Sequence, residues 1–189
     1  MREILGAEPA VNIDVLQGRD ATRPALEKAF RSGKYDVVHY AGHAYFDPRD
    51  PAASGILCAG KVVLGGRDLV GLGNLPALVF FNACEAARIR RAPTRETTRA
   101  PTIRERIDTS IGFAEAFLRG GVANYVGTYW PVGDEPAKLF AERFYKGLMR
   151  GESISAALVA SRQAVWETGS VDWADYIHYG NHNFVLKSG

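Results

Sequence analysis

The sequence is poor in cysteine, with only Cys58 and Cys84 among its 189 residues. Disulfide frameworks and paired-thiolate metal sites need closely spaced Cys residues, or Cys and His clusters, so neither is expected. No apolar run approaches the ~20 residues of a membrane-spanning helix, and the first residues lack the apolar core of a signal peptide. These absences predict a soluble, cytoplasmic protein in a reducing compartment, without membrane contact.

The sequence also lacks a strong charge of either sign, since 23 Lys and Arg residues oppose 21 Asp and Glu residues. A net charge of +2 at pH 7 gives no electrostatic footprint for nucleic acid. Seven arginines and two prolines fall between about residues 85 and 109, where apolar residues show almost no periodicity. These arginines have no aromatic residues between them and are mixed with acidic ones, so we expect a long solvated loop and no nucleic-acid partner.

Apolar residues make up 47% of the chain, enough to bury one substantial core. We therefore expect a single domain over residues 1–189. Apolar runs alternate with helical patterns, which is typical of an α/β fold with a mostly parallel sheet. Strands are expected at 12–16, 36–40, 77–82, 122–127 and 182–186, a hairpin at 56–64, a helical turn at 67–70, and helices at 22–31, 110–119, 135–149 and 153–166.

The first expected strand begins close to Met1, which leaves little room for the strand and helix that usually open such a sheet. We expect the N-terminal edge of the domain to be truncated or supplied by an upstream segment.

Two reactive side chains follow two of the expected strands. His43 lies in the loop after residues 36–40, and Cys84 comes directly after residues 77–82. Reactive groups in such sheets gather beyond the carboxyl ends of the strands. If the two strands are adjacent, the imidazole and the thiol face one another.

This pair has the chemistry of a nucleophile and its base. A thiol is mostly protonated at neutral pH, and a neighbouring imidazole raises its thiolate fraction. Backbone N–H groups around His43 and Cys84 are candidate oxyanion donors, with Gly42 permitting a sharp turn. Taken alone, however, a Cys at a strand end is more often a buried apolar residue, and a His after a strand is usually structural. Cys58, inside the expected hairpin, is interpreted as a core residue.

Four segments resemble the CHAT family, the caspase-like domains often found C-terminal to TPR repeats. They are HYAGHA (39–44), FFNACEA (81–87), FAEAFLRGGVANYVGTYWPVGDEPA (113–137) and FAERFYKGLMRGESISAAL (140–158). The resemblance runs from about residue 18 to the C-terminus. It implies a caspase-like three-layer sandwich, with a mostly parallel central sheet flanked by helices. It further implies a regulated cysteine endopeptidase acting on proteins or peptides, controlled by a partner or by upstream TPR-type repeats.

The resemblance also assigns roles to individual residues. The family's catalytic histidine and cysteine fall on His43 and Cys84, whereas His39 matches its strand histidine and is interpreted as structural. Trp130 and Asp134 lie in a strand-to-helix corner near the family's substrate cleft, where Asp134 is alternatively a helix cap.

Three departures from the family pattern affect these roles. Ala44 stands where caspase-like enzymes usually carry Gly, so an oxyanion donor there is less freely oriented. Gly133 replaces an acidic residue common in the corner, which weakens the prediction of a substrate pocket there. The Arg-rich loop is longer than expected and stands where caspases carry their activation cleavage loop, so a processed or regulatory segment is the alternative to a mobile loop.

Further acidic residues and histidines are candidates for substrate or metal binding. Asp47, Asp50 and Glu85 lie close in sequence to the dyad and would favour a basic substrate side chain, although each is alternatively a surface carboxylate. The histidine pairs His39/His43 and His178/His182 have helical metal-site spacing but no accompanying Glu and no expected helix. No metal and no cofactor are therefore predicted.

The sequence thus predicts hydrolysis of peptide bonds through a thioester by a His43–Cys84 dyad. Two alternatives remain open. One is a caspase-like scaffold or interaction module that no longer turns over substrate. The other is a thiol amidohydrolase acting on a small molecule, which would use a glycine-flanked nucleophile turn that is missing around Cys84.

Overall fold

The computed structural model describes residues 11–45, 47, 50, 53–82, 102, 104, 114–129 and 132–186. Contacts divide the chain into two compact units. The sheet unit comprises Leu16–Pro131 and Ile177–Tyr179, and the helical unit comprises Met1–Val15, Val132–Tyr176 and Gly180–Gly189. The organisation of the chain as a single domain stays a prediction.

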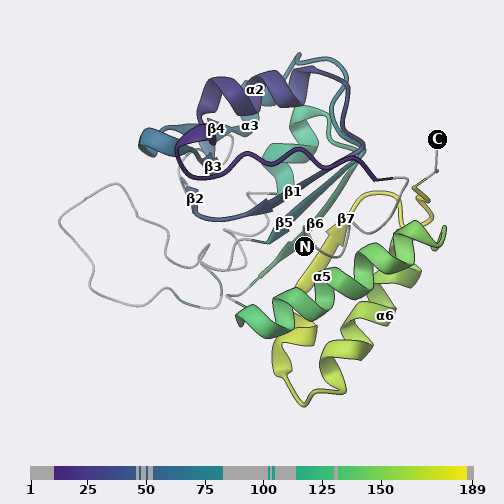
Figure 1. Ribbon diagram of the computed structural model, residues 1–189. Helices are drawn as coiled ribbons and strands as arrows, with labels where there is room; N and C mark the ends of the chain where they lie inside the picture. Colours follow the sequence, from purple (N-terminus) through teal and green to yellow (C-terminus); the bar gives the residue numbers. More distant parts are fainter. Residues whose placement is uncertain are drawn as a thin grey trace. The chain divides into compact units, whose positions relative to one another are not determined.

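The fold is mixed α/β, with a mostly parallel sheet flanked by helices, consistent with a caspase-like sandwich (Figure 1). The order of strands in this sheet is β1-β5-β6-β7. Their bounds are β1 Val37–Ala41, β5 Leu78–Asn82, β6 Asn124–Thr128 and β7 Tyr176–Tyr179. β5 pairs in parallel with β1 on one side and with β6 on the other. All five residues of β5, Leu-Val-Phe-Phe-Asn, are buried, which confirms the prediction of a central strand.

Helix α2 (Arg23–Arg31) begins where the sequence predicts. The side chain of Thr22 accepts a hydrogen bond from the backbone N–H of Ala25 at 3.3 Å, and Pro24 occupies the first turn, where no N–H is needed. Phe30, the buried residue of this helix, enters the core of the sheet unit. The helix is thereby fixed by its cap at one end and by apolar packing at the other.

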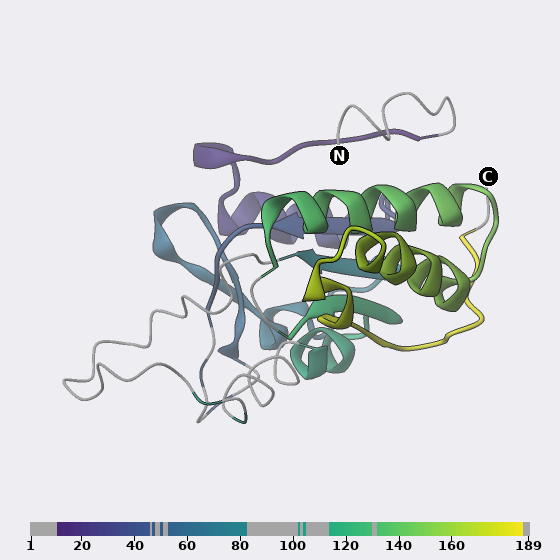
Figure 2. The same cartoon turned by 90° about the horizontal axis from the view of Figure 1, so that it is seen from below.

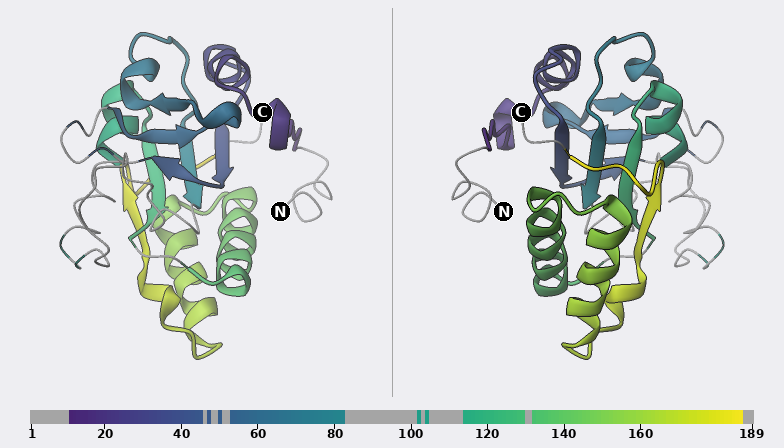
Figure 3. Two further views of the ribbon diagram at one scale, coloured as in Figure 1. Left: turned by 90° about the vertical axis from the view of Figure 1, so that its left-hand side faces the viewer. Right: turned by 90° about the vertical axis from the view of Figure 1, so that its right-hand side faces the viewer.

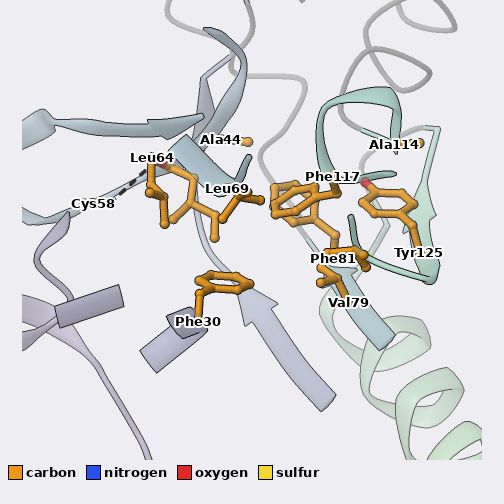
Figure 4. Close-up of a cluster of buried hydrophobic side chains, with 12 residues drawn as sticks. Phe30, Ala44, Cys58, Leu64, Leu69, Val79, Phe81, Ala114, Phe117 and Tyr125 are labelled. Atoms are coloured by element: carbon orange, nitrogen blue, oxygen red, sulfur yellow. Dashed lines mark hydrogen bonds between the residues drawn. The ribbon is translucent and has the colours of Figure 1, made fainter. Parts of the chain in front are cut away.

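The core of the sheet unit forms on the face of β5 that carries Val79 and Phe81 (Figure 4). Phe117, on the helix at 114–120, and Tyr125 of β6 lie beside Phe81, with ring centroids 5.6 and 6.0 Å from it. Side chains on alternate residues of a strand share one face, so Val79 and Phe81 enter the core together. This core holds β5 and β6 against the helices that cover this face.

A second, three-stranded sheet follows β1 directly. It has the order β2-β3-β4, and both pairings are antiparallel. Its strands are β2 Ala44–Tyr45, β3 Gly55–Leu57 and β4 Val63–Gly65, with the short helices η3 Ala59–Lys61 inside the hairpin and α3 Gly66–Leu69 after it. The strands lie side by side in both views of Figure 3. The predicted hairpin and helical turn are confirmed.

The helical unit is built from two long helices, α5 (Asp134–Met149) and α6 (Ile154–Trp166), which lie alongside each other (Figure 2). The 3-10 helix η4 (Val171–Ala174) packs against α6. The ring of Phe140 stacks on that of Tyr176 with centroids 3.4 Å apart. Arg162 of α6 donates a hydrogen bond to the carbonyl of Tyr176.

Two predicted strands are wrong. Residues 11–17 have no regular structure, and η1 (Gly18–Asp20) follows them. Ile13, Val15 and Leu16 are 37–46% exposed, so this stretch has the composition of a strand but no buried face. The expected strand at 182–186 is reduced to one isolated bridge, between Ser153 and Val185.

The structure also contains a strand that the sequence did not predict. β7 is the run Tyr-Ile-His-Tyr, which is short and contains a polar residue. No described helix is long and apolar enough to cross a membrane.

Candidate active site

The two strands that lead to His43 and Cys84 are direct neighbours. β1 and β5 run parallel, and their register pairs Ala41 with Asn82, the last residue of each strand. His43 and Cys84 each follow this final pair by two residues. Cys84 lies outside the described residues. The register brings the ends of β1 and β5 to the same rim of the sheet, at the same level.

His43 is held by its backbone and leaves its side chain exposed. Its carbonyl oxygen accepts two hydrogen bonds, one from the N–H of Leu57 at 3.0 Å and one from the hydroxyl of Tyr40. Leu57 is the last residue of β3, and Tyr40 belongs to β1. The loop is therefore tied to both sheets while its imidazole faces outward.

Gly42 stands at a bend between β1 and β2, as the predicted turn requires, and its φ lies outside the left-handed region. What this position demands of its residue is small size. A Cβ at this position would lie 2.8 Å from the Tyr40 hydroxyl oxygen and 3.0 Å from its Cζ. A side chain here would push the tyrosine away from the His43 carbonyl.

Ala44 lies in β2 and is 3% exposed, with its methyl group in the core of the sheet unit (Figure 4). It pairs with Ile56 of β3. The peptide group between His43 and Ala44 is planar, so its N–H points away from the side to which its carbonyl points. Because the His43 carbonyl points to Leu57, the Ala44 N–H points away from β3.

His39 is packed within the sheet, whereas His43 is exposed. Its ring stacks on Phe80 of β5 with centroids 4.9 Å apart and an interplanar angle of 12°. Burial lowers the pKa of His39 to about 4, so the ring is neutral at physiological pH. These contacts agree with the structural role expected for it.

The acidic residues considered for substrate binding have structural contacts. The Asp47 carboxylate accepts a hydrogen bond from the Asp50 N–H at 3.3 Å, and the Asp47 N–H donates to Ser54 Oγ at 3.0 Å. Asp50 forms a 2.7 Å ion pair with Arg67. Both carboxylates thus have partners within the chain, which weakens the argument that Asp47 selects a basic substrate.

The remaining predicted cleft residues are spread over different parts of the chain. Glu85 and Trp130 lie outside the described residues, as does the Arg-rich loop apart from residues 102 and 104. Asp134 is the first residue of α5 in the helical unit. The residue that caps this helix is Gly133, whose N–H donates to Asp172 Oδ2 at 3.1 Å, so the alternative reading of Asp134 as the cap is wrong.

Cys58 is a core residue, as predicted from its place in the hairpin. Its side chain is 5% exposed, and Sγ lies 3.7 Å from the carbonyl oxygen of Ile56 (Figure 4). Burial raises the pKa of this thiol, which disfavours the nucleophilic thiolate. Among the described residues, no group of three or more His, Cys, Asp or Glu side chains could hold a metal ion.

A contact between two tyrosines of the sheet unit is not predictable from the sequence. Tyr129 directly follows β6, and its hydroxyl lies 3.3 Å from that of Tyr179 in β7. Burial, together with the hydrogen bond from Tyr129, raises the pKa of Tyr179 to about 12. The Tyr-Trp pair after a Gly-rich apolar run was the only sequence signal, and it carried no indication of the partner in β7.

Comparison with known proteins adds one finding. The family model described as CHAT domain matches residues 2–181, nearly the whole chain. The match spans both compact units. No curated protein matches the sequence.

Proposed function

The chain belongs to the CHAT domain family, a caspase-like family, and on this premise we propose that it is a cysteine endopeptidase with His43 and Cys84 as its catalytic dyad. The proposal rests on one observation above all. The two residues follow paired ends of neighbouring parallel strands, with Ala41 opposite Asn82.

Chain geometry supports the pairing of the two side chains. Neighbouring strands lie about 4.8 Å apart, and two further residues can carry a chain at most about 7 Å from the strand end. Both residues are two positions beyond the paired ends, so the reach is the same on each side. A hydrogen bond between imidazole and thiol is compatible with these limits.

The proposed reaction is hydrolysis through a thioester. His43 accepts the proton of the Cys84 thiol, and the thiolate attacks the carbonyl carbon of the scissile peptide bond. The tetrahedral intermediate collapses as the C–N bond breaks, and the imidazolium of His43 gives its proton to the leaving amine. Water then attacks the thioester with His43 again as base, which releases the carboxylic acid and restores the thiol.

The oxyanion of each tetrahedral intermediate needs backbone donors at the same rim. We assign this role to the N–H groups of Ala44 and Cys84. The Ala44 N–H points away from the hairpin, because the His43 carbonyl on the same peptide group is taken by Leu57. A glycine at position 44 is therefore not required for orientation, since the hairpin already fixes this peptide.

The substrate class we propose is a protein or peptide segment. The His43 side chain is exposed, which allows an extended chain to approach it. An enzyme for a small molecule would instead enclose its reactive groups in a concave, mostly apolar site. From the family membership we further propose that a regulatory partner, or upstream repeats of the TPR type, controls access to the dyad.

Cleavage of a peptide library is the test. We expect wild-type protein to cleave a subset of peptides, and both Cys84→Ala and His43→Ala to lose at least about 100-fold of that activity. Two matched controls, Cys58→Ala and His39→Phe, alter a thiol and an imidazole of the sheet unit that lie outside the proposed dyad, and both should retain cleavage.

Equal cleavage by wild type and Cys84→Ala would show that the activity belongs to a contaminant. Full activity of His43→Ala would remove the base from the proposal. A wild type that is inert toward every peptide and every thiol-reactive peptide electrophile would favour the alternative of a caspase-like scaffold.

A further inference from the structure

We propose that Tyr40 is a positioning residue for the dyad, in that its hydroxyl holds the peptide group between His43 and Ala44 in the orientation that the reaction needs. This inference rests on the proposed function of His43. It concerns a residue that takes no part in proton transfer and does not touch the substrate.

The contacts of Tyr40 join the parts of the proposed site. Its ring stacks on Phe81 of β5 with centroids 4.9 Å apart and an interplanar angle of 28°. Phe81 lies three residues before Cys84 in sequence. Its hydroxyl donates to the carbonyl of His43. One side chain thus links the strand that leads to the nucleophile with the loop that carries the base.

The hydroxyl is the second donor to the same oxygen, because the N–H of Leu57 also donates to it at 3.0 Å. Two donors from different elements fix the plane of the peptide, whereas one donor leaves it free to rock about that bond. The orientation of this plane sets the direction of the Ala44 N–H. The Cα of His43 lies in the same plane, so the orientation of the peptide also affects the direction of the Cα–Cβ bond and the place of the imidazole.

Tyr40 is suited to act as a permanent donor. Burial raises the pKa of its phenol above the ordinary value, so the hydroxyl keeps its proton throughout the physiological range. Gly42 leaves the space that the hydroxyl occupies, since a Cβ there would lie 2.8 Å from the oxygen. The two residues therefore act together: Gly42 provides the space, and Tyr40 provides the hydrogen bond.

The test uses the full chain and four proteins: wild type, Tyr40→Phe, Gly42→Ala and the double variant. We expect Tyr40→Phe to lower kcat by about 10-fold while KM stays within about 2-fold, because misdirected groups weaken transition-state contacts and leave substrate contacts intact. Gly42→Ala should lower kcat similarly by displacing the hydroxyl. In the Tyr40→Phe background the same glycine change should have a clearly smaller effect on kcat, since the bond is already lost.

A matched control separates this role from a general loss of a phenol. Tyr35→Phe removes a hydroxyl just before β1 and should leave kcat unchanged. If Tyr40→Phe lowers the melting temperature but not kcat, the hydroxyl is only structural and the inference fails. Independent, fully additive effects of the two changes at positions 40 and 42 would also overturn it.

A second measurement keeps the inference apart from the proposed function. Hydrogen exchange of the Leu57 amide reports the shared carbonyl directly, and it should be faster in Tyr40→Phe than in wild type. If wild type and Cys84→Ala are equally inactive, the endopeptidase proposal fails. Unchanged exchange at Leu57 would then show that the hydrogen bond from Tyr40 to the His43 carbonyl does not hold this peptide either. If wild type is active and neither kcat nor exchange changes in Tyr40→Phe, the positioning role alone is refuted.

Discussion

Replacement of His39 by phenylalanine should make the fold less sensitive to acid. Burial lowers the pKa of His39 from 6.5 to about 4, so the unfolded chain takes up this proton at a higher pH than the folded chain does. The free energy of unfolding therefore falls as pH drops from 6.5 toward 4, and the contribution of His39 is fully present above 6.5. Phenylalanine keeps the stack on Phe80 and cannot be protonated.

The magnitude follows from the gap between the two pKa values. A difference of one pH unit corresponds to about 1.4 kcal/mol, so His39 accounts for about 3 kcal/mol of acid destabilisation in all. Between pH 7 and pH 4.5 most of this loss takes place. Urea unfolding at these two pH values should thus show a loss for wild type that exceeds the loss for His39→Phe by about 2 to 3 kcal/mol.

The comparison is a difference between two pH values, so a general change in stability caused by the substitution cancels. His43→Phe is the matched control, because the side chain at 43 is exposed, and it should retain the steep loss seen in wild type. An identical pH dependence of wild type and His39→Phe would refute the argument that His39 is buried in its neutral form.

Three further predictions concern stability. Burial raises the pKa of Asp175 to about 6, so the folded state disfavours the charged carboxylate, and the full cost in stability applies above pH 6. With allowance for solvent screening, Asp175→Asn should therefore gain about 1 kcal/mol of stability at pH 7, or about 2–4 °C in melting temperature. Calorimetry at pH 7 and below pH 4 checks this, and an equal gain at both pH values would contradict it. Gly55→Ala places a Cβ 1.9 Å from the Leu64 carbonyl oxygen and should lower the free energy of unfolding by about 3 kcal/mol or more. Gly60→Ala has open space around the new methyl group but a φ of 77°, and it should lower the free energy of unfolding by about 1–2 kcal/mol. Chemical unfolding of both variants gives the order, and the reverse order would show that the hairpin adapts to the added methyl group. Ser153→Ala removes the N-cap of α6 and should cost about 1 kcal/mol, measured by circular dichroism; equal melting of Ser153→Ala and Ser153→Asp would argue against the cap.

Those features that depend on local patterns were predictable from the sequence. Thr22 and Pro24 mark the start of α2, and the apolar run of β5 marks a strand buried on both faces. Because β1 and β5 could be identified, the common rim for His43 and Cys84 could be inferred. The structure adds their adjacency and their register.

The unpredicted features depend on contacts between distant residues. β7 is buried by its place in the sheet and not by its own composition, whereas residues 12–16 have the composition of a strand and no burial. The bonds of Tyr40 and Leu57 to one carbonyl need β1 and β3 to meet at His43. No spacing in the sequence encodes that meeting, and the close approach of the Tyr40 hydroxyl to Gly42 likewise arises only in the folded chain.

The rate of thiol alkylation as a function of pH tests the dyad most directly. With iodoacetamide and mass mapping of the modified peptides, Cys84 of wild type should react well below pH 8.5, the pKa of an ordinary thiol, while the buried Cys58 remains unmodified in the folded protein. In His43→Ala, the reactivity of Cys84 should shift to that of an ordinary thiol. Alkylation of Cys84 with the same rate and the same pH dependence in both proteins would contradict the pairing of the imidazole with the thiol.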